Sequence, residues 1–497
     1  MPKLTAFLNF LDGNEESNFL ISDSDLENAR IVFGNTSDKK VLQKRILELR
    51  TDYDWNALKK IIKICPHNEQ SDNLIRDAYS IIDKKLLSHQ SLKVCTEHKE
   101  EILSPSRLQG ARNFLTLFIN MLFAGAWYNI GNKAEDFSKY KKFINAFDRL
   151  MQKEGMQFLQ QEKKVHSRDF YLFSTSFVSF NFEMVFPWIF MNSHYELNHR
   201  PPYIQDHPLK LWLDYGVEHR GRKLAGGKIE PTLEFTESVA SRENEDDHIG
   251  TPINRAGKFY FAHGSSNWRE CHVCGRMTFF HGNNDWGDYK SKKLIPCFPV
   301  PLFDSDSIAK TEFTQQEINW RNELKYDSLQ CMHCGSETKA LDAPMIMQTM
   351  YKSTPTSFLE EIQRNVKVSL EKARHIVLLG YRLPPDDTIW QHAFAEGIRA
   401  RAENDKTFCT VVVGHKGEKG WLYEDELLQF VETHRKDDDK DDYGVDAIEN
   451  AIAIFGRDKV RAWTGGIPQV FGNCTEKEVK DLFYPDFVEW SGTRIEK

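Results

Sequence analysis

The sequence lacks the features that would assign it to a membrane or to a secretory route. No secretory leader is visible at its start, and no apolar run reaches the roughly 20 residues that a transmembrane helix needs. The most apolar run, Phe114 to Tyr128, is interrupted by Asn120 and Gly125 and predicts a buried helix instead. We therefore expect a cytoplasmic protein with no membrane partner.

The sequence also lacks an excess of basic residues and a cysteine pattern typical of disulfides. The formal net charge is −8 at pH 7, whereas a broad nucleic-acid surface needs a clustered excess of Lys and Arg, so nucleic acid is not an expected partner. The nine cysteines are an odd number and fit a reducing compartment better than a disulfide framework. Hydrophobic residues, by contrast, make up 40% of the 497 positions, which is enough for a large folded core.

Four of the cysteines form two C-x2-C pairs: Cys271, Cys274, Cys331 and Cys334. Each pair places two thiolates on one tight turn, and two such turns complete a tetrahedral zinc site. The alternative is four core thiols without a metal. His272 and His333 lie inside the pairs and are possible substitute ligands, although four thiolates are simpler. Because a closed four-sulfur site has no open position, we expect the metal to stabilise the fold.

The pattern along the chain predicts an α/β fold. Residues 4–105 and 107–165 have mostly helical patterns, and residues 200–256 are predicted as surface loops with short strands. Strands and helices alternate after that. The predicted strands are Phe170–Phe180, Phe259–Ala262, His375–Gly380, Phe408–Val413 and Lys459–Trp463, and the predicted helices are 358–373, 384–399 and 447–455. This alternation predicts a Rossmann-like parallel sheet with helices on both faces.

Three polar or small residues lie at or just after the ends of predicted strands: Asn181, His263 and Gly380. Ligands of parallel sheets bind at the carboxyl ends of the strands, so we expect these residues to converge. Histidine suits a general base because it titrates near neutral pH. The alternatives are a strand-end histidine without chemistry and an asparagine that only forms a turn.

Three separated motifs occur in order along the chain: Ser-Phe-Asn-Phe-Glu at 179–183, Phe-Ala-His-Gly-Ser-Ser-Asn-Trp at 261–268, and Leu-Gly-Tyr-Arg-Leu-Pro-Pro-Asp-Asp at 379–387. Together, with the cysteine pairs between the second and the third, they resemble the bacterial sirtuin-like family of NAD-consuming enzymes, which is often found in antiphage defence. Residues 344–352 are similar to the segment that returns the chain to the sheet in that family. The resemblance covers residues 165–415.

The resemblance implies roles for individual residues. His263 would be the catalytic base, and Asn181 would orient the ribose or the attacking water. The cofactor-binding residues would be Glu183, Gly264, Ser265, Gly380, Tyr381 and Asp387. Ser265 and Asp387 also have structural interpretations that need no ligand. Ser265 fits a turn, and the pair Asp386-Asp387 after two prolines fits the start of a helix.

The chain departs from the family pattern in two places. The family opens with a strand and a Gly-Ala-Gly-x-Ser turn that holds the dinucleotide phosphates, and we find no such turn in this sequence. One hypothesis is that the start codon lies upstream, and another is that the chain is truncated. Glu183 also stands where the family has Asp, which moves the carboxylate by one methylene.

The resemblance favours an NAD hydrolase that releases nicotinamide and ADP-ribose as an antiphage effector. The alternatives are an NAD-dependent protein deacylase and a non-catalytic NAD- or ADP-ribose-binding subunit of a defence complex. Expected partners are NAD, a second copy of the chain, or a partner ATPase or sensor. We divide the chain into a sirtuin-like NAD-binding domain (1–473), a helical insertion (98–165), a zinc-ribbon-like module (264–345) and a C-terminal tail (474–497).

Overall fold

The structure is a computed structural model of the whole chain. It describes residues 53–66, 74–96, 99–131, 138–161, 171–182, 186–187, 189–190, 210–214, 222–223, 229–230, 254–266, 268–279, 329–331, 334–347, 356–384, 387–399, 407–414, 419–435, 443–467 and 469–485.

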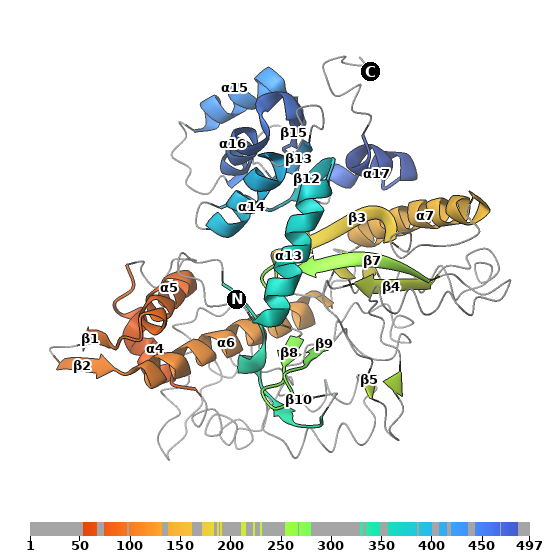
Figure 1. Cartoon of the computed structure of the whole chain (residues 1–497). Coiled ribbons are helices and arrows are strands. Elements are labelled where there is room, and N and C mark those ends of the chain that lie inside the picture. The colour runs from red at the N-terminus through yellow and green to blue at the C-terminus, as the bar shows by residue number, and fades with distance from the viewer. Residues whose placement is uncertain are drawn as a thin grey trace.

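The fold is mixed α/β, as the alternating pattern predicts (Figure 1). Its principal strands are β3 (Tyr171–Ser179), β4 (Lys210–Asp214), β7 (Asn254–Phe261), β12 (His375–Leu379), β13 (Phe408–Val412), β14 (Trp421–Tyr423) and β15 (Val460–Trp463). In one sheet β7 lies between β3 and β4, and all three strands are parallel. The other sheet has the order β12-β13-β15-β14, in which only β14 is antiparallel. Within the described ranges the two groups of strands form separate hydrogen-bonded sheets. The structure therefore shows a mixed α/β fold but not the predicted single Rossmann-like sheet.

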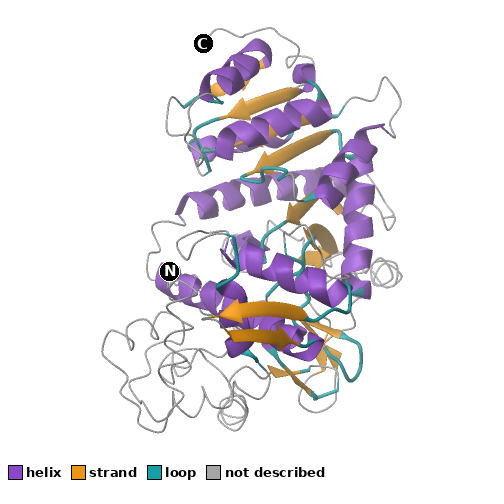
Figure 2. Cartoon of the chain, turned by 90° about the vertical axis from the view of Figure 1, so that its left-hand side faces the viewer, coloured by secondary structure: helices purple, strands orange, loops and turns teal. Residues whose placement is uncertain are grey.

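Helices pack around the C-terminal sheet (Figures 1 and 2). They are α13 (Ser357–Lys372), α14 (Thr388–Arg399), α15 (Glu424–His434), α16 (Tyr443–Phe455) and α17 (Glu476–Phe483). Helix α13 begins where the Thr356 side chain accepts a hydrogen bond from the Leu359 backbone N–H, and its buried face carries Leu359, Ile362 and Val366. This three- and four-residue spacing is the helical period that the sequence predicts.

The main hydrophobic core joins the two larger sheets. It contains Phe259 and Phe261 of β7, Ile376 and Leu378 of β12, and Phe143 of α7 (Ser138–Gln161). It also contains Val479 and Leu482 of α17, which lies in the segment 474–497 that we had set apart as a tail. That segment therefore contributes a helix to the core.

A second core belongs to a helical module, which we define as residues 53–131. Its elements are α4 (Trp55–Ile62), α5 (Leu74–Leu87), β1 (Leu92–Thr96), β2 (Lys99–Leu103) and α6 (Pro105–Gly131). The mostly helical prediction for this stretch did not include the β1-β2 hairpin, which Figure 2 shows in front of the module's helices. Leu92 and Val94 are buried at alternate positions, a period-two signal too short to stand out against the surrounding helical pattern.

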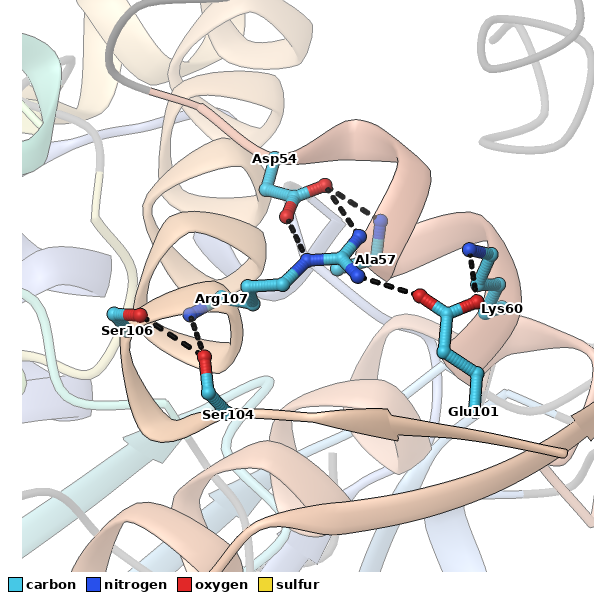
Figure 3. A network of polar contacts seen from close by, with 7 residues as sticks. All are labelled: Asp54, Ala57, Lys60, Glu101, Ser104, Ser106 and Arg107. Atoms are coloured by element: carbon cyan, nitrogen blue, oxygen red, sulfur yellow. Dashed lines mark hydrogen bonds and ion pairs between the residues drawn. The ribbon is translucent and has the colours of Figure 1, made fainter.

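Arg107 fastens three elements of the helical module together (Figure 3). Its guanidinium donates from Nε to Asp54 at 2.7 Å and from Nη1 to Glu101 at 2.6 Å. Asp54 also accepts a hydrogen bond from the Ala57 backbone N–H at the start of α4. Hydrogen bonds from Lys60 and Arg107 lower the pKa of Glu101. The network thus ties β2 to the first turns of α4 and α6.

The remaining described elements are short: β5 (Arg222–Lys223), β6 (Ile229–Glu230), β8 (Trp268–Glu270), β9 (Met277–Phe279), β10 (Leu329–Gln330), β11 (Glu337–Thr338), η4 (Ala340–Asp342), η5 (Arg457–Lys459) and η6 (Gln469–Phe471). The apolar run that begins at Phe114 lies in α6. Among the described helices, none combines the length and the apolar character that crossing a membrane requires.

Candidate functional site

The strands β3, β7 and β12 end close together, and the candidate site lies there. In the β3–β7 register Ser179 pairs with Phe261, so the chain reaches Phe180 and His263 at the same edge of the sheet. From the other sheet, β12 ends at Leu379, two residues before Tyr381. The rings of Phe180 and Tyr381 stack at 3.9 Å between centroids, and Phe180 meets the His263 ring edge-on at 5.4 Å. The segments that follow these three strands therefore meet through Phe180, His263 and Tyr381.

His263 lies in a buried polar group. Its side chain is 1% exposed. The Trp390 indole Nε1 donates a hydrogen bond to His263 Nε2 at 3.2 Å, and Asp387 Oδ2 lies 3.4 Å from the same nitrogen. The other ring nitrogen, Nδ1, lies 3.4 Å from the Phe180 carbonyl oxygen. Both nitrogens of the predicted base thus face protein groups.

Asp387 connects His263 to Tyr381. Its side chain is fully buried, and its Oδ2 accepts a hydrogen bond of 2.7 Å from the Tyr381 hydroxyl. Its backbone carbonyl accepts hydrogen bonds from Trp390 and Gln391, so the same residue starts helix α14. The helix-start reading of Asp387 is correct for its backbone, while its side chain points to the histidine.

Gly264 keeps the turn after β7 in contact with residues 344–346. Its φ is +80°, and a Cβ at this position would lie 1.6 Å from the Pro344 carbonyl oxygen. Gly264 forms an isolated antiparallel bridge with Met345, and the Ile346 N–H donates to the His263 carbonyl at 2.9 Å. A glycine is required here for steric reasons, whether or not a ligand binds.

Ser265 and Ser266 attach the same turn to the end of β3. Both hydroxyls donate to the Phe182 carbonyl oxygen, at 2.8 and 3.1 Å, and so does the Ser266 backbone N–H at 2.8 Å. The Phe182 and Met345 side chains are buried in the core of the helical module. The histidine turn is therefore held from two sides by segments that are anchored in that module. The contact to Phe182 agrees with the simpler reading of Ser265 as a turn residue.

For Asn181 and Gly380 the structure gives backbone contacts. Asn181 is exposed, and its backbone exchanges hydrogen bonds with the Ser179 hydroxyl. Gly380 has a φ of +67° and donates its N–H to the Val412 carbonyl. Glu183 and Asp386 lie outside the described residues.

The sequence interpretation missed Trp390, the hydrogen-bond donor to His263. It follows Asp387 by three residues at the start of a helix, a spacing that puts two side chains on the same face. That spacing alone does not distinguish a core tryptophan from a site residue, because the donor role appears only when β7 and α14 are placed side by side.

The four paired cysteines form the second part of the candidate site. Their sulfur atoms all lie within 4.8 Å of one another. The Sγ–Sγ distance is 3.6 Å between Cys271 and Cys334 and 3.7 Å between Cys274 and Cys331. Sulfurs bound at about 2.3 Å to a tetrahedral ion would lie about 3.8 Å apart, whereas disulfide sulfurs are bonded at about 2.05 Å. The donor set and its spacing therefore fit a metal ion such as zinc.

The two cysteine turns have the same construction. In each turn, the backbone N–H of the first cysteine donates to the carbonyl oxygen of the residue five positions later. The N–H of the glycine after the second cysteine donates to the carbonyl oxygen of the first cysteine. These glycines, Gly275 and Gly335, have φ values of +64° and +76°. The hairpins β8-β9 and β10-β11 hold the turns. His272 is 63% exposed and lies outside the sulfur cluster, and His333 is not among the described residues.

The thiols differ in acidity when no metal is bound. Burial raises the pKa of Cys271 and raises that of Cys274 to about 12. Hydrogen bonds with Ser336 lower the pKa of the exposed Cys334 to about 6. Metal binding must displace the protons of the buried thiols, so affinity should rise with pH.

No protein-family model matches this chain, and a search of curated proteins finds no match either. Function must therefore be inferred from the site itself.

Proposed function

We propose that this protein is a sirtuin-like NAD hydrolase that releases nicotinamide and ADP-ribose and acts as an antiphage effector. The observation that carries the proposal is the buried group His263, Asp387, Tyr381 and Trp390 at the carboxyl ends of β7 and β12. Buried polar groups cost stability unless they are paired, and such groups beside strand ends are characteristic of functional sites. NAD is proposed as the substrate because the three ordered motifs resemble those of the sirtuin-like family.

The proposed reaction is hydrolysis of the bond between nicotinamide and ribose. Water attacks C1′ of the nicotinamide ribose, its proton passes to His263, and the breaking C1′–N bond leaves its electron pair on the nicotinamide nitrogen. Positive charge builds on the ribose in the transition state, as in other glycosidic cleavages. Asn181 would orient the ribose or the water, and Gly380 and Tyr381 would line the NAD site, with Gly264, Ser265, Glu183 and Asp387 in the supporting roles that the resemblance implies.

For the metal we propose zinc, bound by Cys271, Cys274, Cys331 and Cys334. Thiolates favour zinc over magnesium or calcium, and four of them leave no position for substrate. The zinc would hold the two hairpins together, and the chemistry would belong to the histidine site. Elemental analysis of the purified protein should find one zinc per chain.

A non-catalytic NAD- or ADP-ribose-binding subunit is the second candidate. The burial of His263 favours it, because a ring that is 1% exposed must be uncovered before substrate can reach it. The stacked rings of Phe180 and Tyr381 lie beside His263 and would have to move for the hydrolase to work.

The deciding experiment measures nicotinamide release and NAD binding by the purified protein, with and without acyl-lysine peptide. A hydrolase releases nicotinamide without peptide, a deacylase only with it, and a binding subunit binds NAD without releasing any. His263→Ala should lower release by about 100-fold or more. The matched control is His392→Ala, which removes a 69% exposed histidine from helix α14. Equal release by both variants would contradict the assignment of the base.

A further inference from the structure

We propose that Asp387, Tyr381 and Trp390 are positioning residues for His263. They determine which ring nitrogen carries the proton in the neutral histidine, and they hold the charged ring after it accepts a second proton. This goes beyond the cofactor-binding role that the resemblance implies for Asp387 and Tyr381, and Trp390 has no role in that resemblance.

The tryptophan fixes the tautomer. An indole N–H can only donate, so the 3.2 Å hydrogen bond from Trp390 Nε1 requires an unprotonated Nε2 on His263. The proton of the neutral ring must then sit on Nδ1, which faces the Phe180 carbonyl at 3.4 Å. The neutral ring is therefore held as the Nδ1–H tautomer. Nε2 is then the nitrogen that can accept a proton.

The carboxylate stabilises the ring once Nε2 is protonated. Asp387 Oδ2 lies 3.4 Å from Nε2, and both side chains are buried, where opposite charges interact more strongly than in water. A proton taken from the attacking water would lie on Nε2 between the ring and this oxygen. The Trp390 N–H must then turn away from the protonated nitrogen.

Tyr381 orients the carboxylate. Its hydroxyl donates at 2.7 Å to the same Oδ2 that faces His263, so the oxygen is held between the two rings. Tyr381 also stacks on Phe180, whose carbonyl faces Nδ1. One tyrosine thus touches two of the three residues that contact the imidazole nitrogens, Asp387 and Phe180.

The first test reads the tautomer and needs no activity. Nitrogen NMR of histidine-labelled full-length protein at pH 8, with the His263 signals identified by their loss in His263→Gln, should show the Nδ1–H form. In Trp390→Phe the donor is gone while Asp387 remains, so the population should move toward Nε2–H. Trp463→Phe, which removes an indole N–H bonded to Gly466 instead, is the matched control. A wild-type ring protonated on Nε2, or no change in Trp390→Phe, would overturn the proposal.

The second test is kinetic and depends on the proposed hydrolase. Asp387→Asn should lower kcat by about 100-fold, the scale of one acid–base contribution, with little change in KM. Tyr381→Phe should lower kcat by less, and Tyr79→Phe, which removes a buried hydroxyl bonded to Thr116, should not. Equal effects on kcat and KM, or none, would contradict a positioning role. If the wild-type protein hydrolyses no NAD, the proposed function fails and the tautomer measurement alone decides this inference.

Discussion

The cysteine cluster and the histidine site lie close together in sequence but are built in different ways. Each cysteine turn is local, because four consecutive residues and a following glycine supply both ligands and the bend. The histidine site draws on residues after β3, after β7, after β12 and in α14. A local turn can be recognised from spacing, whereas a site assembled from distant segments depends on the packing of two sheets.

Removing a metal ligand should give the largest effect. Cys331→Ser should lose the metal and much of the stability of the cysteine hairpins, because structural zinc sites contribute about 10 kcal/mol or more of binding free energy. Cys95→Ser is the control, since Cys95 is exposed on β1 and is not part of the sulfur cluster. Zinc content and thermal unfolding measure both. If Cys331→Ser kept one zinc per chain, the four-cysteine assignment would be wrong.

A matched pair of glycine substitutions tests the histidine turn. Gly264→Ala and Gly275→Ala both place a side chain at positive φ, which costs roughly 1–2 kcal/mol. Only at Gly264 does the new Cβ meet the Pro344 carbonyl, while nothing lies within 4 Å at Gly275. Urea unfolding should therefore show a much larger loss for Gly264→Ala. Similar losses would mean that residues 344–346 do not hold the turn as described.

The half-buried His375 should make the protein sensitive to acid. It hydrogen-bonds to the Phe483 carbonyl and the Thr410 hydroxyl, and burial lowers its pKa to about 3. The unfolded chain takes up this proton below pH 6.5 and the folded chain does not, so stability present above pH 6.5 is lost as pH falls toward 3. The slope is about 1.4 kcal/mol per pH unit for this one group.

Urea unfolding of the wild type and His375→Gln at several pH values between 7 and 4 isolates that slope. The wild type should lose stability faster with acid than the variant does. Parallel curves would show that His375 is protonated in the folded protein.

Two neighbouring glutamates on β2 should give the smallest effects. Glu101 joins the Arg107 network, whereas Glu100 pairs with Lys93 on the surface. Glu101→Gln should lower the urea midpoint slightly and Glu100→Gln should leave it unchanged, since exposed ion pairs contribute little. Equal midpoints would show that the network in Figure 3 does not stabilise the helical module.

Much of the fold around the site could be predicted from sequence. The carboxyl ends of β3, β7 and β12 fall within two residues of the predicted ones, whereas β7 begins five residues before its predicted start at Phe259. The β1-β2 hairpin could not be predicted, because its five-residue strands lie between long helical patterns. The separation of these strands into two sheets could not be predicted either, because periodicity does not specify which strands pair.

The site was predictable only in part. The cysteine cluster follows from spacing, and His263 was predicted from its place after a strand together with the motif resemblance. The contacts of Asp387 and Trp390 with His263 do not, because they join positions more than 120 residues apart. Conversely, Asn181 was predicted as catalytic, yet its side chain is exposed and the rings of Phe180 and Tyr381 lie against His263.

The central claim is that the histidine site performs chemistry on NAD and the cysteine site serves the fold. It is tested most directly by measuring nicotinamide release side by side for the zinc-loaded protein, the cadmium-exchanged protein and His263→Ala. Cadmium also binds thiolates, so the exchanged protein should keep its rate, while His263→Ala should fall by about 100-fold or more. An unchanged rate in His263→Ala, or loss of activity on cadmium exchange without unfolding, would contradict the account.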